Sequence, residues 1–172
     1  MLETMRLRFP VVLLLGFLLL TTPAALTAST FRLRSPVFPP GGAIPRKFTC
    51  EGIDAPPPLR WTSPPRGTRS FAILMDDPDA SGGTFTLWLG WNIPAKVRSL
   101  AAGQHAPVEG RNDERIFYTA PCMVCCGRHH FVFRLLALRA PLKLAPGATR
   151  RQFDAALRGK VLATARLVGT VG

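Results

Sequence analysis

The chain has 172 residues, which fits one domain with a short appendage and is too short for two cores of ordinary size. Hydrophobic residues make up 47% of the chain, a share that excludes an intrinsically disordered protein. The formal net charge is +12, and the 17 prolines and 15 glycines exceed their usual combined share of about 12%, which argues against a helical bundle.

The first 28 residues have the pattern of a secretory signal peptide. Arg6 and Arg8 precede an apolar run at residues 11–20, and small residues follow up to Ala28. The run is shorter than the roughly 20 apolar residues that a bilayer crossing needs. We therefore expect a signal peptide over residues 1–28, a single domain over residues 29–172, export to the periplasm or the medium, and no stable membrane span after cleavage. An uncleaved N-terminal anchor is the alternative.

Four runs of apolar, β-branched and aromatic residues predict strands, with proline- and glycine-rich loops between them. They lie at residues 70–75, 87–93, 131–138 and 161–168. Thr149 and Gln152 form a capping box ahead of Phe153, which predicts one short helix in the C-terminal region. The expected fold is mostly β, a sandwich with one short helix.

The positive charge is spread along the chain, with no run of more than two basic residues. This pattern is unlike the basic patches that bind nucleic acid. An exported protein also meets little nucleic acid, so no nucleic-acid partner is expected. The charge suits anionic surfaces such as lipid head groups or cell-envelope polymers. A solvated arginine-rich surface without a partner is the alternative.

Three carboxylates follow the first expected strand, at Asp76, Asp77 and Asp79. Carboxylates this crowded repel one another unless donors hold them or one becomes protonated. Two interpretations stay open: a binding site, or a tight turn stabilised by Asp and Pro.

The cysteines and histidines between Cys122 and His130 invite a zinc interpretation. Only Cys50 and His105 remain to supply a distant ligand pair, and export favours disulfides, so no metal is expected. Four cysteines allow three pairings, of which we prefer Cys50–Cys122. The adjacent Cys125 and Cys126 would form a strained disulfide, so free thiols or an intermolecular contact are expected there.

Catalytic patterns are weak. His129 near a cysteine, or paired with Asp77, could act as a base, but the chain has no G-x-S-x-G and no H-E-x-x-H motif. A histidine that merely lines a site or the surface is the simpler interpretation. We expect a protein that is not an enzyme, with no catalytic residues and no cofactor.

Seven blocks can be compared with known families: residues 38–52, 57–61, 65–79, 91–94, 118–122, 127–138 and 146–163. In this order they resemble the phosphatidylethanolamine-binding protein (PEBP) family, in its bacterial Raf-kinase-inhibitor-like branch. The resemblance covers about residues 36–170. It implies a β-sandwich with a large antiparallel sheet, and a pocket at one end of that sheet. The implied ligand is a small anionic or amphiphilic molecule of the phosphate or phospholipid-headgroup type, bound without catalysis.

The resemblance assigns the pocket residue by residue. Asp77 and Asp79 match the two aspartates of the family's DPD loop, and His129 matches its later pocket histidine. The other implied ligand-binding positions are Phe131, where the family has an aromatic residue, Ala120 and Pro121 in the proline-rich loop, and Leu87, where the family has its first pocket histidine.

Three departures change the expected pocket. Leu87 cannot donate a hydrogen bond, as the family's histidine can. Losing one donor to a charged ligand costs on the order of 1.5–3 kcal/mol of binding free energy. Ser81 replaces a proline, so a trans peptide bond after Ala80 is expected. Ala120, Met123 and Val124 replace glycine and two prolines, and the last two make the pocket more apolar. We hypothesise a degenerate or retuned pocket for a more hydrophobic ligand; the alternative is a protein-interaction module, such as a protease or kinase inhibitor.

Overall fold

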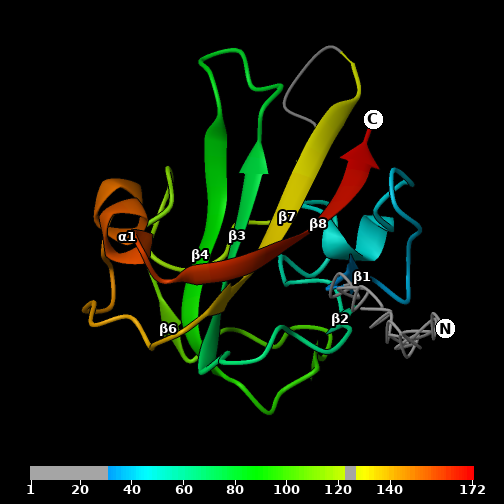
Figure 1. Ribbon diagram of the computed structural model, residues 1–172. Helices are drawn as coiled ribbons and strands as arrows, with labels where there is room; N and C mark the ends of the chain where they lie inside the picture. The colour runs from blue at the N-terminus through cyan, green and yellow to red at the C-terminus, as the bar shows by residue number, and fades with distance from the viewer. Residues whose placement is uncertain (1–30, 123–126) are drawn as a thin grey trace, which may run out of the picture.

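The computed structural model describes residues 31–122 and 127–172 and consists of two antiparallel sheets and one α-helix (Figure 1). The larger sheet has the strand order β6-β4-β3-β7-β8, and the smaller has the order β1-β2-β5. The long strands are β3 (Ser70–Asp77), β4 (Phe85–Pro94), β7 (His129–Leu138) and β8 (Val161–Val171). The short elements are β1 (Leu33–Arg34), η1 (Arg46–Phe48), β2 (Leu59–Trp61), β5 (Ser99–Leu100), β6 (Val108–Glu109) and α1 (Arg150–Leu157).

The mostly β fold and its one α-helix confirm the expectation from the sequence. Each predicted strand is present and is longer than predicted by two to three residues. The short strands and the 3-10 turn η1 were not predicted, because two or three residues carry no recognisable periodicity. The expected signal peptide lies outside the described residues.

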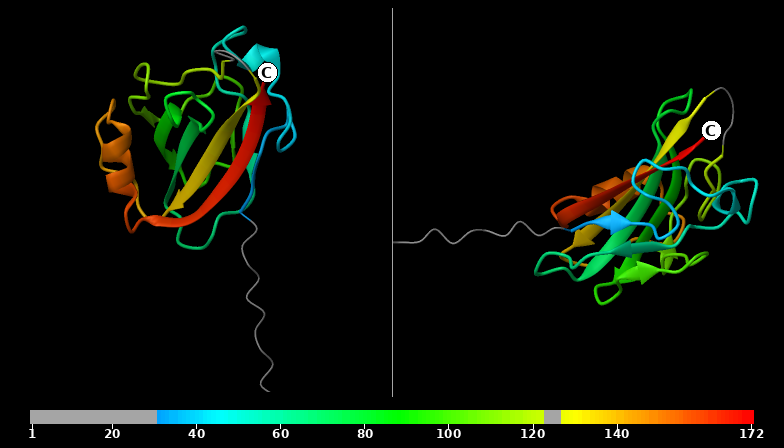
Figure 2. Two further views of the ribbon diagram at one scale, coloured as in Figure 1. Left: turned by 90° about the horizontal axis from the view of Figure 1, so that it is seen from above. Right: turned by 90° about the vertical axis from the view of Figure 1, so that its right-hand side faces the viewer.

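Strand β3 is buried along its whole length because both faces of the larger sheet are covered. Phe71, Ile73 and Met75 contact the smaller sheet, whereas Ala72 and Leu74 belong to a second cluster beneath α1. Successive side chains of a strand point to opposite faces, so a strand covered on both sides appears as an unbroken apolar run. Figure 2 shows α1 and β1 on different sides of the long strands.

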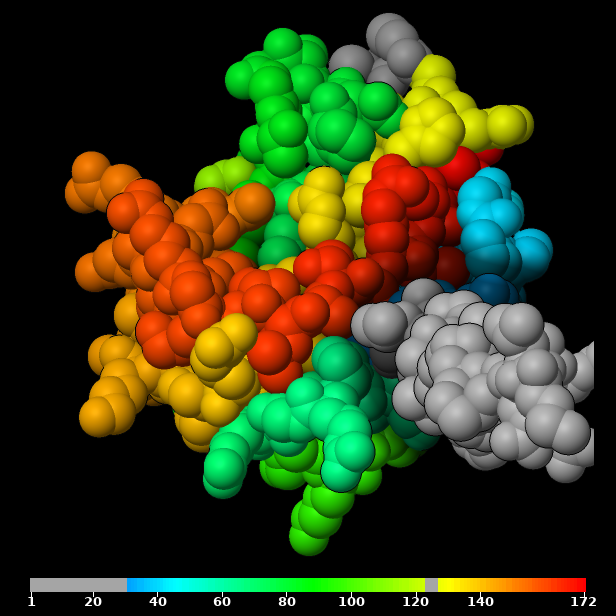
Figure 3. Space-filling view, viewed as in Figure 1, coloured from blue at the N-terminus to red at the C-terminus, as the bar shows by residue number. Residues whose placement is uncertain are grey.

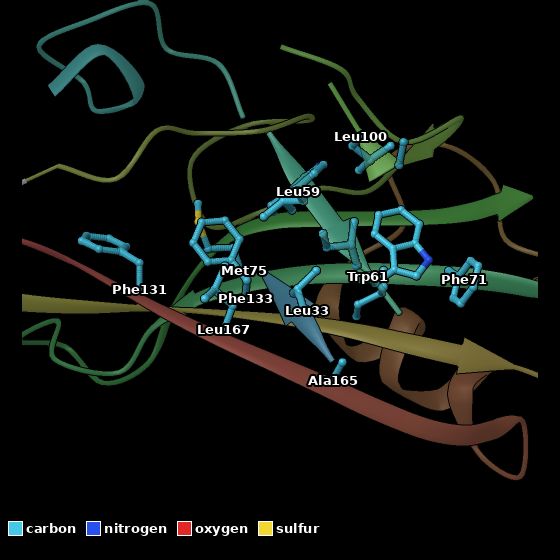
Figure 4. Close-up of a cluster of buried hydrophobic side chains, with 14 of the residues drawn as sticks. Leu33, Leu59, Trp61, Phe71, Met75, Leu100, Phe131, Phe133, Ala165 and Leu167 are labelled. Carbon is cyan, nitrogen blue, oxygen red and sulfur yellow. The ribbon is translucent and has the colours of Figure 1, made fainter. Parts of the chain in front are cut away.

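The main core lies between the two sheets and is rich in aromatic rings (Figure 4). Trp61 from the smaller sheet packs edge-on against Phe71 of the larger, with ring centroids 5.4 Å apart. Leu59, Phe133 and Leu167 fill the space beside them and are at most 1% exposed.

Helix α1 begins with the predicted capping box: the Thr149 side chain accepts from the N–H of Gln152, whose side chain accepts from the N–H of Thr149. Phe153, the one buried residue of the helix, packs against Trp91 of β4 with ring centroids 5.8 Å apart. The helix and β8 form adjoining parts of the surface, with the β3–β4 hairpin above them (Figure 3).

Asp76 connects four elements near the end of β3. Its carboxylate accepts from the hydroxyl of Thr86 in β4 at 3.1 Å, from Arg134 of β7 at 2.6 Å and from Arg150 of α1 at 2.7 Å. Burial opposes the charge of Arg150, but Asp76 and then Asp154 outweigh it and raise the pKa of the guanidinium. Because Asp76 is only 1% exposed, these donors replace the water that the carboxylate loses on folding.

Replacing Asp76 by alanine should lower the free energy of unfolding by about 2–3 kcal/mol, measured by urea denaturation. Removing one partner of a buried ion pair leaves the other charge uncompensated. The two arginines are partly exposed and regain some water, which limits the loss.

The matched control is Asp154→Ala, which removes the exposed partner of the same Arg150. An exposed ion pair is worth about 0.5 kcal/mol, so a similar loss in both variants would contradict the role given to Asp76.

Candidate functional site

A cavity of about 670 Å³ is lined by residues of the β3–β4 hairpin and of the start of β7. These two segments lie at the same end of the larger sheet (Figure 1). The expected site residues Asp77, Asp79, Leu87, Ala120, His129 and Phe131 all line it. Pro121 lies between the lining residues Ala120 and Cys122 but does not itself line the cavity. Its carbonyl accepts a hydrogen bond from the N–H of Cys50 at 3.0 Å. The remaining wall consists of Cys50, Asp54, Ala80, Ser81, Gly82, Phe85, Glu114, Arg115, Thr119 and Cys122.

The pair of His129 and Asp77 forms the polar wall of the cavity. The ring Nδ1 of His129 lies 2.6 Å from a carboxylate oxygen of Asp77, and the side chains are 12% and 7% exposed. The second oxygen of Asp77 accepts from the N–H of Asp79 at 2.9 Å, which holds the start of the β3–β4 loop. The ring of Phe131 stacks on His129. These contacts fix the imidazole against the cavity.

The next residue of β7 holds the same loop from the other side. His130 donates its backbone N–H to Asp79 at 2.7 Å, and its ring Nδ1 lies 2.7 Å from the same oxygen. The side-chain hydrogen bond from His130 is the main reason why the pKa of Asp79 lies below its usual value. The family resemblance did not assign His130 to the site, and only its place beside His129 in the sequence pointed to it.

The expected disulfide between Cys50 and Cys122 is present, with Cα atoms 5.2 Å apart. Both cysteines line the cavity, so the bond forms part of its wall. A sulfur in a disulfide has no thiolate for a metal or a substrate, which removes Cys122 from the zinc and nucleophile interpretations. Met123, Val124, Cys125 and Cys126 lie outside the described residues.

Leu87 presents an apolar surface where the family pattern has a histidine. Its side chain is 4% exposed, and its carbonyl accepts from the Asn112 side chain at 2.7 Å and from the N–H of Thr119 at 3.0 Å. These bonds hold the segment at residues 112–119 against β4. The peptide bond between Ala80 and Ser81 is trans, as expected.

Arg115 and Asp54 form a wall that the sequence did not predict. They make an ion pair through Nη2 of Arg115, whose Nε donates to the carbonyl of Tyr118 at 3.2 Å. The second oxygen of Asp54 accepts from the N–H of Ala120 at 2.9 Å. No pattern in the sequence connects these residues, because the two side chains are 61 positions apart.

The cavity offers groups of both charges. Asp54, Asp77 and Asp79 are each held by donors, whereas the carboxylate of Glu114 makes no hydrogen bond or ion pair within the described residues. The donors at the wall are His129, Arg115, the hydroxyls of Ser81 and Thr119, and nearby backbone N–H groups. Such a set can hold an anionic group and a cationic group of one ligand.

A family model described as phosphatidylethanolamine-binding protein matches residues 34–172. The chain belongs to the phosphatidylethanolamine-binding protein family. A UPF0098 protein of Pyrococcus abyssi is 42% identical over 146 residues, which are 78% of this chain and 82% of that protein. LppC of Mycobacterium tuberculosis, which is named as a lipoprotein, is 39% identical over 155 residues, 87% of this chain and 76% of LppC.

Two solved structures of PEBP proteins share the fold. A structure described as a PEBP homolog from Chlamydia trachomatis has a TM-score of 0.80 and 32% identity, covering 84% of this chain and 99% of its own. E. coli YbcL, described as a new member of the mammalian PEBP family, has a TM-score of 0.75 and 26% identity, covering 81% of this chain and 96% of its own.

Replacing His130 by alanine should raise the pKa of Asp79 toward its usual value, measured by NMR titration of the carboxyl carbons. A carboxyl with a lowered pKa in the folded state adds stability above its unfolded pKa, and this stability is lost as the pH falls through the lowered value. The variant should therefore lose less stability than the parent protein on acidification in that range.

The control is His105→Ala, because the ring of His105 pairs with Glu109 and not with Asp79. An unchanged titration of Asp79 in His130→Ala would show that the His130 ring does not hold this carboxylate in solution.

Proposed function

We propose that the protein is an exported binding protein that holds a small phosphate-type or amphiphilic ligand, of the phospholipid-headgroup class, without catalysing a reaction. The observation that carries the proposal is the pair of His129 and Asp77 at the wall of a cavity of about 670 Å³. Membership in the PEBP family supports the same class of ligand.

The donors of the pocket suit a phosphate group. The imidazole of His129 and the guanidinium of Arg115 can donate hydrogen bonds to the charged oxygens of a phosphate. The N–H groups of Ser81 and Gly82 make no hydrogen bond within the described residues and add neutral donors. The carboxylate of Glu114 suits the ammonium group of a zwitterionic head group.

The apolar wall favours a ligand with hydrocarbon beside its phosphate. Leu87, Phe85, Phe131 and Ala120 line the same cavity, and Leu87 offers no donor. Burial of apolar ligand surface contributes about 25 cal/mol per Å², which offsets part of the affinity lost with that donor. We therefore infer that amphiphilic ligands bind more tightly than inorganic phosphate.

The disulfide supports binding over catalysis by a thiol nucleophile at the described wall. Cys50 and Cys122 are joined in a disulfide, so neither can attack a substrate next to His129. Pairing with Asp77 then positions His129 as a ligand-binding group.

Export rests on three observations. The sequence of residues 1–28 fits a signal peptide, the disulfide fits an oxidising compartment, and the relative LppC is named as a lipoprotein. The helices of residues 31–122 and 127–172 lack the length and apolarity that crossing a membrane requires. We infer that the mature protein is periplasmic or secreted.

Phosphoethanolamine at millimolar concentration should raise the Tm of the mature protein, and His129→Ala should weaken this binding about ten- to a hundredfold. The factor corresponds to one charge-assisted donor, worth about 1.5–3 kcal/mol. Leu87→His adds an imidazole to the same wall and should tighten binding by a similar factor. Titration calorimetry gives the dissociation constants.

The control is His105→Ala, because His105 does not line this cavity. Absence of any shift with phosphate, phosphoethanolamine or short-chain phospholipid would contradict the proposal. A protein partner that still binds after His129→Ala and Asp77→Ala would favour the interaction-module alternative.

In a native expression host, the protein should be recovered from the periplasm or the medium without about its first 28 residues. A non-reducing digest of this protein should contain one peptide pair that joins Cys50 to Cys122. Mass spectrometry measures both. Recovery of the full-length, reduced chain from the cytoplasm would contradict export.

A further inference from the structure

A second cavity of about 690 Å³ adjoins the candidate site. Its wall is largely apolar, with Ala106, Pro107, Val108, Ile116, Phe117 and Tyr118. Asp54 and Arg115 line both this cavity and the first, so their ion pair forms the border between the two. A ligand that passes over this border contacts the polar pocket and the apolar cavity at the same time.

We propose that the second cavity binds the hydrocarbon chain of a phosphate-headed amphiphile whose head group occupies the first pocket. The proposal rests on the proposed function, and it narrows the ligand to molecules with an alkyl or acyl chain attached to the phosphate. Continuity across the border identifies the occupant, because the chain of such a ligand begins where its phosphate is held.

The rim of the second cavity exposes large apolar side chains. Phe117 is 58% exposed and Ile116 is 37% exposed, and they are neighbours in the chain. Adjoining exposed apolar side chains next to an apolar cavity are typical of ligand-binding grooves. A hydrocarbon chain lying across them would remove this surface from water.

The backbone holds Phe117 at the rim in an unfavourable conformation. Its φ is +90°, a value that aromatic residues rarely adopt and that is costly for them. The buried side chain of Asn112 donates to the carbonyl of Phe117 at 2.6 Å, and the N–H of Phe117 donates to Gly110 at 3.2 Å. Backbone strain that the surroundings maintain is typical of binding sites, and here it keeps an aromatic ring beside the cavity.

Arg115 is suited to hold the phosphate at the border. Its ion pair with Asp54 joins side chains that are 48% and 45% exposed, and exposed pairs are weak, so a phosphate can compete for the guanidinium. The bond from its Nε to the carbonyl of Tyr118 fixes its position. Nη1 of Arg115 makes no hydrogen bond within the described residues and can donate to the ligand.

The carboxylate of Glu109 in the second cavity does not oppose a hydrocarbon chain. Glu109 is 4% exposed and accepts from the indole of Trp88 at 2.7 Å, and its carboxylate lies 3.1 Å from His105 Nδ1. Because its oxygens are already engaged, the carboxylate does not need a polar ligand in the cavity.

The test is a calorimetric series with methyl, butyl, hexyl and octyl phosphate, each below its aggregation concentration. Affinity should rise along the series by up to about fourfold per methylene, the factor for complete burial of a CH₂ group. In Phe117→Ser and in Ile116→Ser, the ratio of octyl to methyl phosphate affinity should fall at least tenfold. The control is Ile53→Ser, which removes an apolar side chain whose exposure, 51%, lies between those of Ile116 and Phe117; it lines neither cavity and should keep the parent ratio.

Each outcome has a separate meaning. Methyl phosphate binding that depends on His129, with no gain from a longer chain, would overturn the chain-binding cavity and leave the proposed function standing. A gain along the series that survives both Phe117→Ser and Ile116→Ser would also overturn it, because the chain would lie elsewhere. Failure of every phosphate to bind would contradict the proposed function itself, and the inference with it.

Discussion

The pairing of three carboxylates at the end of β3 with basic side chains is the constraint on which the site depends. Asp76, Asp77 and Asp79 lie within four residues, and each is met by a basic side chain from another element. Asp76 pairs with two arginines at the junction of β3, β7 and α1. Asp77 and Asp79 pair with the first two residues of β7. These carboxylates therefore connect the strands and the loop at this end of the sheet.

The same pairing organises the pocket before any ligand enters it. His129 and His130 are adjacent on β7, so their side chains leave opposite faces of the strand and hold the β3–β4 loop from two sides. The disulfide between Cys50 and Cys122 fixes the opposite wall and closes a loop of 72 residues. A wall held by covalent and ionic contacts loses little conformational entropy on binding, which favours affinity for a small ligand.

The features that could be predicted from the sequence were those encoded by contiguous residues. The apolar run of β3 and the capping box at Thr149 carry their own patterns, and the blocks around Asp77 and His129 carried the resemblance to the PEBP family. The ion pair of Arg115 with Asp54 carries no such pattern, because the fold brings together two charged loop residues. From the sequence, Asp76 could belong to a binding site or to a tight turn. In the structure, strand alternation points its side chain away from the cavity and toward Arg134.

Leu87, at a position where the family resemblance has a histidine, and Arg115, at the border with the second cavity, both favour a ligand with hydrocarbon beside its phosphate. Leu87 offers no donor at the wall of the first cavity, and Arg115 supplies one at the border with the apolar cavity. On the proposed function, a phosphate held between His129 and Arg115 directs its hydrocarbon chain over the border, toward Ile116 and Phe117. The positive charge of the chain, +12 before the expected cleavage of residues 1–28, then acts at longer range, because a positive field attracts anionic amphiphiles and surfaces that carry them. On the proposed function the pocket is retuned: His129 and Arg115 hold the phosphate, and Leu87 makes the wall beside them more apolar.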